Sequence, residues 1–185
     1  MSIYAVTGSA SGMGKATADR LREHGHTVIG VDLRDADIIA DLSNPQGRAF
    51  AASEVLHQSG GKLRGAVLAA GIGPGPGRTR ALAEINYLGA VELLTAWRPA
   101  LAATASAKVV VFSSNSTTTT PLIPGSAIRA LLDGNAAKAE RIMGRFGKNA
   151  PSLMYGTSKI ALSRWLRRAA VTPAWAGAGI RLNAI

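Results

Sequence analysis

Cysteine is absent from the 185 residues, which excludes disulfide bridges and thiolate chemistry and leaves the compartment only weakly constrained. Charged residues make up only 17% and hydrophobic residues 47%, a balance that allows a large core and argues against disorder. No apolar run reaches the roughly 18 residues that a membrane-spanning helix needs. The chain enters a strand-like run at once, without a basic segment or a cleavage site. These absences predict a cytoplasmic protein without a membrane partner.

Acidic residues are also few, since 21 Lys and Arg stand against 11 Asp and Glu and give a net charge of +10. Such an excess is one mark of nucleic-acid binding. The basic residues are scattered, however, apart from Arg164, Arg167 and Arg168, and no aromatic residues alternate with them. We therefore predict no nucleic-acid partner and interpret the charge as a basic surface that also suits an anionic ligand.

Short apolar runs alternate with helical patterns along the chain. The runs are continuously apolar, which predicts strands buried on both faces of a parallel sheet flanked by helices. The expected strands are 3–6, 27–31, 37–40, 65–69, 108–112 and 180–182, and the expected helices are 14–24, 45–57, 79–101 and 152–171. The pattern predicts an α/β fold with a Rossmann-type doubly wound sheet, formed by a single domain over residues 1–185.

Residues 115–150 interrupt this alternation. The segment begins with a polar run rich in threonine and then carries an apolar pattern at helical spacing over 136–146. We interpret it as a helical insertion within the domain and not as a linker between two domains.

A glycine-rich turn follows the first expected strand and opens a helix. Gly8 allows the turn, Gly12 allows a ligand to approach the backbone, and Gly14 lets the helix pack on the strand. Backbone N–H groups at such a helix start face a pyrophosphate. The turn therefore predicts a dinucleotide site, which includes Ser11 and Met13.

Asp32 ends the second expected strand and precedes Leu33, near the distance from the glycine turn at which a carboxylate binds the ribose hydroxyls of the adenosine half. A carboxylate there repels a 2′-phosphate, so the sequence favours NAD over NADP, although Lys15 and Arg34 would suit NADP. The alternative is that Asp32 serves only as a cap or turn residue.

Asp41 and Leu42 follow the third expected strand, where they can flank the adenine, with the carboxylate accepting from the exocyclic amine. A helix cap is nearly as consistent for Asp41, because Ser43-Asn44-Pro45 also announces a helix start.

Tyr155 and Lys159 stand one helical turn apart, downstream of Ser114. A free phenol has a pKa of about 10, and a lysine on the same helix face can stabilise the phenolate for acid–base chemistry. In isolation such a pair is more often a half-exposed surface pair, but the dinucleotide turn reverses that judgement. The three histidines form no pair with a convincing metal spacing, so we predict no metal.

These motifs together resemble the short-chain dehydrogenase/reductase family over nearly the whole chain. The matching motifs are the glycine pattern at 7–14, a degraded strand-four motif Ala69-Ala70-Gly71, the helix asparagine Asn86, the serine Ser114, the Tyr155/Lys159 pair and a closing strand at 179–185. The stretches 32–36, 39–43 and 70–74, and the long spacing from Ser114 to Tyr155, are similar to the bacterial 3α-hydroxysteroid dehydrogenase/carbonyl reductase branch. In that branch the insertion is helical and alters the usual oligomer interface.

The resemblance implies NAD-dependent interconversion of a secondary alcohol and a carbonyl, with a hydrophobic substrate such as a steroid-like molecule. Tyr155 would be the acid–base group, while Lys159 would stabilise the phenolate and bind the nicotinamide ribose. Ser114 would hold the substrate oxygen, although Ser113 or Ser116 is an alternative. Asn86 would position a water between Lys159 and solvent, or would simply satisfy a buried backbone group.

The resemblance also places the cofactor against Ala70, Gly71 and Ile72 and implies a homodimer or homotetramer. Family members continue beyond the last motif with a Pro-Gly segment, a substrate-binding segment and a final strand, so we expect this chain to be a fragment. The alternative is a naturally short protein that lacks a competent substrate pocket. The alternative function is a catalytically idle NAD-binding module that senses redox state or assembles with a partner.

Overall fold

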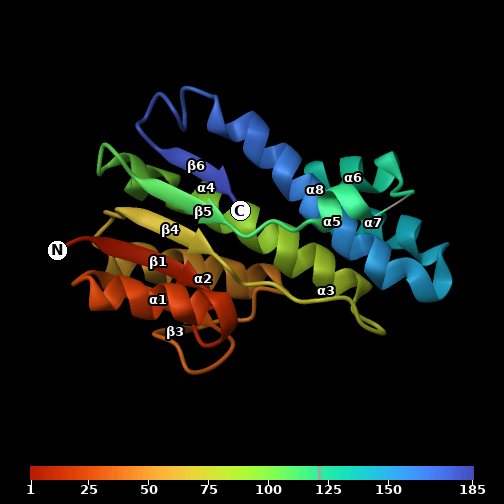
Figure 1. Ribbon diagram of the computed structural model, residues 1–185, viewed down its shortest axis with the longest axis horizontal. Coiled ribbons are helices and arrows are strands. Elements are labelled where there is room, and N and C mark those ends of the chain that lie inside the picture. The colour runs from red at the N-terminus through yellow and green to blue at the C-terminus, as the bar shows by residue number, and fades with distance from the viewer. Residues whose placement is uncertain (121) are drawn as a thin grey trace.

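The computed structural model describes residues 1–120 and 122–185, so Pro121 of the predicted insertion lies outside the described residues. Six parallel strands form one sheet in the order β3-β2-β1-β4-β5-β6 (Figure 1). The strands are β1 (Ile3–Thr7), β2 (Thr27–Asp32), β3 (Ile38–Ile39), β4 (Gly65–Leu68), β5 (Lys108–Val111) and β6 (Arg181–Ala184). The order reverses direction between β1 and β4, which confirms the predicted doubly wound fold and puts a ligand site at that point.

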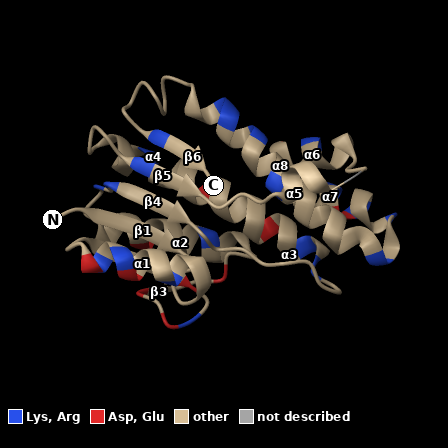
Figure 2. Cartoon of the chain, viewed as in Figure 1, with Lys and Arg blue, Asp and Glu red and all other residues tan. Residues whose placement is uncertain are grey.

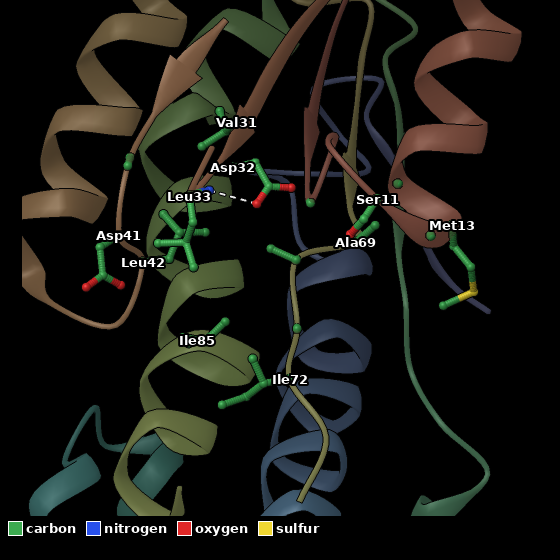
Figure 3. A pocket seen from close by; sticks show the side chains of 16 residues that line it. Ser11, Met13, Val31, Asp32, Leu33, Asp41, Leu42, Ala69, Ile72 and Ile85 are labelled. Atoms are coloured by element: carbon green, nitrogen blue, oxygen red, sulfur yellow. Dashed lines mark hydrogen bonds between the residues drawn. The ribbon is translucent and has the colours of Figure 1, made fainter. Parts of the chain in front are cut away.

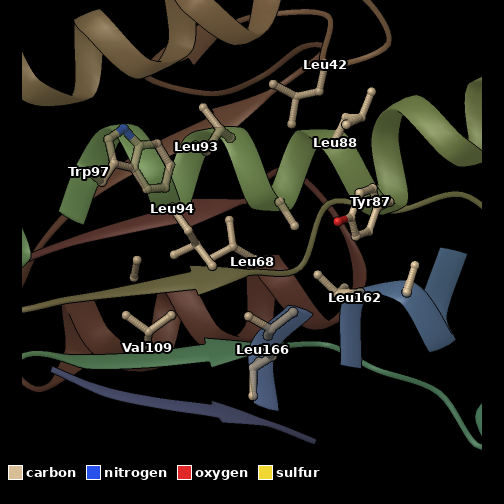
Figure 4. Packing of buried hydrophobic residues seen from close by; sticks show 14 of the residues in the cluster. Leu42, Leu68, Tyr87, Leu88, Leu93, Leu94, Trp97, Val109, Leu162 and Leu166 are labelled. Carbon is tan, nitrogen blue, oxygen red and sulfur yellow. The ribbon is translucent and has the colours of Figure 1, made fainter. Parts of the chain in front are cut away.

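Helices cover both faces of the sheet. On one face, α1 (Gly12–Glu23) buries Ala18 against Val6, Val28 and Val67. The other face carries α2 (Pro45–Gln58), α4 (Ala90–Ala102) and α8 (Ala150–Ala170), whose apolar side chains meet the sheet in the larger core. Figure 4 shows this packing for α4 and α8 against β4 and β5. The two apolar layers explain why the strands are continuously hydrophobic.

The third strand is shorter than the expected 37–40. Asp37 is not part of it, because its Oδ2 accepts the backbone N–H of Gly30 at 2.7 Å, a donor that a longer β3 would otherwise pair. A side-chain carboxylate thus replaces a strand carbonyl at this edge of the sheet.

The expected helix at 79–101 is divided. It consists of α3 (Thr79–Ala83), the π-helical turn η1 (Glu84–Gly89) and α4, and the extra residue of a π-helical turn shifts which side chains face the sheet. Such turns are frequent at functional sites, and this one contains Asn86.

The insertion contains α5 (Ser116–Thr119), α6 (Gly125–Leu132), α7 (Ala136–Gly144) and the 3₁₀ turn η2 (Gly147–Asn149). The sequence predicted α7 but not α6. Buried residues of both helices, among them Leu131 and Met143, belong to the same apolar cluster as the sheet. This continuity supports the proposal that residues 1–185 form one domain.

The basic residues do not gather on one element. Lys and Arg are spread over many elements, with arginines along α8 (Figure 2). Within the described residues, no helix is both long and apolar enough to cross a lipid bilayer.

Candidate dinucleotide and catalytic site

A pocket of about 280 Å³ opens at the carboxyl ends of β1, β2 and β4 (Figure 3). The structure brings together there every predicted cofactor residue except Tyr155 and Lys159. The lining residues are Gly8, Ser11, Gly12, Met13, Gly14, Val31, Asp32, Leu33, Ala40, Asp41, Leu42, Ala69, Ala70, Gly71, Ile72 and Ile85.

The glycine turn forms one wall of the pocket. Each of its three glycines is required for a different structural reason. Gly8 has φ of +70°, and a Cβ there would lie 2.8 Å from the backbone N of Ala70. A Cβ at Gly14 would collide with the carbonyl of Gly8, which forces helix and turn into direct contact. Gly12 has φ of +54°, and a Cβ there would meet nothing within 4 Å, so the space above it is open.

The start of α1 offers donors to this open space. The N-cap, Ser11, makes no side-chain cap bond, and no acidic residue stands in the first turn of the helix. The first backbone N–H groups of a helix have no partner within it and carry partial positive charge. An anion such as a pyrophosphate fits this arrangement.

Asp32 is half-buried and fixed by two backbone donors. Its Oδ2 accepts from Ala10 N at 2.9 Å and its Oδ1 from Leu33 N at 2.7 Å. The first bond ties the end of β2 to the glycine turn. Each carboxylate oxygen keeps a second lone pair that can accept from a ligand hydroxyl, so the turn role and the ligand role of Asp32 are compatible.

Asp41 and Leu42 form the opposite wall (Figure 3). The backbone N–H of Ser43 donates to Asp41 Oδ1 at 2.8 Å and lowers the pKa of this exposed carboxyl below its ordinary value. The bonds stabilise the ionised form, which accepts hydrogen bonds only. The helix cap itself comes from Asn44, whose Oδ1 accepts from Gly47 N at 2.8 Å. The alternative of a plain cap role therefore applies to Asn44 and not to Asp41.

Asn86 lies on η1 and is 1% exposed. Its Oδ1 accepts from Ile72 N at 2.9 Å and its Nδ2 donates to Ile72 O at 3.0 Å. The side chain therefore holds the loop after β4 in place, which is the alternative to the water-positioning role. The proton relay through Asn86 stays a prediction.

Lys159 lies on α8 and is 6% exposed. Its Nζ donates to the carbonyl O of Phe112 at 2.7 Å, directly after β5. Burial lowers the pKa of Lys159 from 10.5 to about 8, because the charged form loses its hydration. The ammonium form still predominates at pH 7, so Lys159 can serve as a buried positive charge beside half-buried Tyr155, one helical turn earlier.

The three candidate serines differ in what their hydroxyls already do. Ser113 Oγ is 3.0 Å from Ser163 Oγ of α8 and joins the strand end to that helix. Ser114 Oγ is half-buried and accepts from Ser116 N at 3.1 Å, with Asn115 Oδ1 as a distant partner at 3.5 Å. Ser116 Oγ is buried without a hydrogen-bond partner among residues 1–120 and 122–185. This pattern favours Ser114, whose hydroxyl is oriented and reachable.

Comparison with known proteins identifies the family. The model of the NAD dependent epimerase/dehydratase family matches residues 4–183. Over all 185 residues the chain is 39% identical to the 3-alpha-hydroxysteroid dehydrogenase/carbonyl reductase of Comamonas testosteroni and covers 71% of it. The chain belongs to the short-chain dehydrogenase/reductase family. By family it is an oxidoreductase, and the resemblance drawn from the motifs is confirmed.

A solved structure supports the same assignment. The 3-alpha-hydroxysteroid dehydrogenase from Pseudomonas sp. B-0831, complexed with NADH, matches with a TM-score of 0.88 and 38% identity, over 99% of this chain and 70% of that one. The Coniferyl-alcohol dehydrogenase of Pseudomonas sp. (strain HR199 / DSM 7063) is 43% identical over 90 residues, 45% of this chain and 33% of that protein. A short-chain dehydrogenase from Streptomyces avermitilis, at 22% identity and a TM-score of 0.73, shows the shared fold alone.

Sequence reasoning missed four residues that line the pocket of this dehydrogenase/reductase fold. Val31, Ala40 and Ala69 stand at or beside strand ends, and the rule that ligands bind at the carboxyl ends of parallel strands could have found them. Ile85 had no such signal, because its position depends on the π-helical turn.

Proposed function

We propose that the chain is an NAD-dependent oxidoreductase that interconverts a secondary alcohol and a ketone or aldehyde, with Tyr155 as the acid–base group. The observation that carries this proposal is a cleft at the strand ends lined by the glycine turn, Asp32 and Asp41. A buried lysine, Lys159, lies one helical turn from Tyr155 on α8. The NADH complex of the Pseudomonas relative, at 38% identity, supports the choice of cofactor.

The residues of the pocket fit NAD. The open space above Gly12 and the first backbone N–H groups of α1 would hold the pyrophosphate, and Asp32 would accept from the adenosine ribose. Asp41 and Leu42 would flank the adenine, and Ala70, Gly71 and Ile72 would support the middle of the cofactor. NAD, when bound, supplies the hydride chemistry that no amino-acid side chain provides. The carboxylate of Asp32 disfavours NADP, because a 2′-phosphate would face a like charge.

The proton chemistry would belong to α8. In reduction, the Tyr155 hydroxyl would give its proton to the substrate oxygen, and in oxidation the phenolate would take it back. The ammonium of Lys159, held by Phe112 O, would stabilise that phenolate through space and could turn to the nicotinamide ribose. The Ser114 hydroxyl would donate to the substrate oxygen and stabilise developing negative charge there.

The substrate is proposed to be a hydrophobic alcohol or carbonyl compound. Two relatives, at 39% and 38% identity, carry hydroxysteroid dehydrogenase in their names, which supports a steroid or a similarly apolar molecule. A homodimer or homotetramer, no nucleic-acid partner and no bound metal stay predictions.

The proposal is tested by titrating the protein with NADH and NADPH and then screening turnover with each cofactor. The panel contains steroid ketones, aromatic ketones and aliphatic ketones, with the matching secondary alcohols for the reverse direction. We expect tighter binding of NADH than of NADPH, and turnover with at least one apolar carbonyl. Tight NADH binding with no turnover on any substrate would instead favour the idle NAD-binding module.

A further inference from the structure

Arg48 lies in α2 and is only 3% exposed, although arginine is rarely buried unless it is paired. Its Nε donates to Glu92 Oε2 at 2.6 Å and its Nη2 to Glu92 Oε1 at 3.2 Å, a bidentate pair. Its Nη1 also donates to Glu84 Oε2 at 2.9 Å. Two carboxylates thus neutralise the buried guanidinium, which explains why the fold tolerates it.

The same guanidinium makes a further bond that neutralisation does not require. Arg48 Nη1 donates to the backbone O of Leu42 at 3.1 Å. Leu42 and Asp41 line the pocket, and a Cβ at Gly47 would collide with the carbonyl of Asp41. The backbone of Asp41 and Leu42 is therefore held by two contacts, the close approach of Gly47 in the first turn of α2 and the hydrogen bond from Arg48.

Glu84 connects Arg48 to a second wall. It is the first residue of η1, and the next residue, Ile85, lines the pocket. Asn86 follows and holds both backbone groups of Ile72, which also lines the pocket (Figure 3). Bonds starting at Arg48 thus reach Leu42 directly and reach the π-helical turn through Glu84.

Glu84 has a second cationic partner that does not touch the pocket. Arg80 Nε donates to Glu84 Oε1 at 2.6 Å, and Arg80 Nη1 lies 3.5 Å from Glu140 Oε2 of α7 in the insertion. The Arg80 side chain is 44% exposed, against 3% for that of Arg48. The network therefore holds two arginines on one carboxylate, of which Arg48 bonds to the backbone of a pocket-lining residue.

We propose that Arg48 is a positioning residue for the adenosine half of the cofactor. It holds the carbonyl of Leu42 and the start of η1 in the spacing that the adenine requires, so the wall is ordered before the ligand arrives. A guanidinium suits this role because its five N–H donors point in fixed directions, whereas a lysine presents one ammonium. The inference rests on the proposed function, since it assumes that the pocket binds NAD.

The test is calorimetric titration of Arg48→Lys with NAD, ADP-ribose and nicotinamide mononucleotide. We expect the Kd of NAD and of ADP-ribose to rise about tenfold, while the Kd of nicotinamide mononucleotide changes less than twofold. Arg80→Lys is the matched control, because it makes the same change on the same carboxylate without touching Leu42. We expect it to leave all three Kd values within twofold.

An Arg48→Lys protein that binds ADP-ribose as tightly as the wild type would overturn the inference, as would an equal loss for both half-ligands. If that variant shows no cooperative thermal transition, Glu92→Gln replaces it, since this carboxylate is 44% exposed and, among residues 1–120 and 122–185, bonds to Arg48 alone. Glu92→Gln should raise the Kd of ADP-ribose about threefold, and an unchanged Kd would refute the positioning role of Arg48. If the wild type does not bind NAD at all, the proposed function is wrong as well. That result is distinguishable from a failure of the Arg48 role alone, in which the wild type still binds NAD.

Discussion

Replacing Lys159 with methionine removes a positive charge that the fold buries next to the proposed acid–base group. Lys159 is 6% exposed, and burial lowers its pKa from 10.5 to about 8. The unfolded chain therefore binds this proton more tightly than the folded protein does. The charge opposes folding below pH 8, and this penalty fades as the pH rises from the folded pKa towards the unfolded one.

The lowering of the Lys159 pKa sets how much the buried charge reduces the free energy of unfolding. It corresponds to a penalty of about 3 kcal/mol at pH 7 and of about 1 kcal/mol at pH 10. Methionine has a similar length and no charge, but it leaves the carbonyl of Phe112 without its donor, at a cost of about 1–3 kcal/mol that does not depend on pH. The stability of Lys159→Met relative to wild type should therefore fall by about 2 kcal/mol between pH 7 and pH 10.

Urea denaturation of both proteins without cofactor, at several pH values between 7 and 10, measures this difference. Lys62→Met, at an exposed position, controls for the loss of a lysine as such and should show a flat difference. The same Lys159→Met protein should have lost turnover, because the proposed phenolate would have no counter-charge. If the difference in unfolding free energy between Lys159→Met and the wild type stays constant from pH 7 to pH 10, the claim that the fold buries a desolvated ammonium here is refuted.

Two further predictions concern individual side chains of the site. Asp32→Ala should weaken NAD binding about 10- to 100-fold and reduce the preference for NAD over NADP, because a carboxylate bond to a hydroxyl is worth roughly 1.5–3 kcal/mol. Calorimetry with both cofactors measures this, and unchanged affinities would remove Asp32 from the ribose site. Ser114→Ala should lower turnover about 10²-fold with NADH binding preserved, because one donor to the substrate oxygen is lost. Ser113→Ala is its control and should have a small effect on turnover, since that hydroxyl already pairs with Ser163. If Ser113→Ala loses more turnover than Ser114→Ala, Ser113 is the hydroxyl that binds the substrate oxygen.

Much of this arrangement could be predicted from local patterns. Continuous apolar runs gave the six strands, and the glycine turn gave the start of α1, because both depend on neighbouring residues in the chain. The family motifs gave Ser114, Tyr155 and Lys159 as a set, although their chemical roles stay predictions.

Other features depend on contacts between distant residues. The single extra residue of η1 leaves no periodic trace, so the helix at 79–101 looked continuous. The burial of Arg48 needs Glu84 and Glu92, which lie 36 and 44 residues away. A carboxylate at Glu84, amid apolar neighbours, was the one local signal for that network. Asp37 shortened β3 through a backbone bond that no propensity describes.

Tyr155 is proposed to move the proton at the substrate oxygen. Steady-state turnover and NADH titration of Tyr155→Phe test this role most directly, with Tyr4→Phe, another half-buried tyrosine, as the matched control. We expect a loss of turnover of about 10²–10⁴-fold, with NADH affinity within twofold of the wild type. Turnover that survives in Tyr155→Phe at the level of Tyr4→Phe would contradict it.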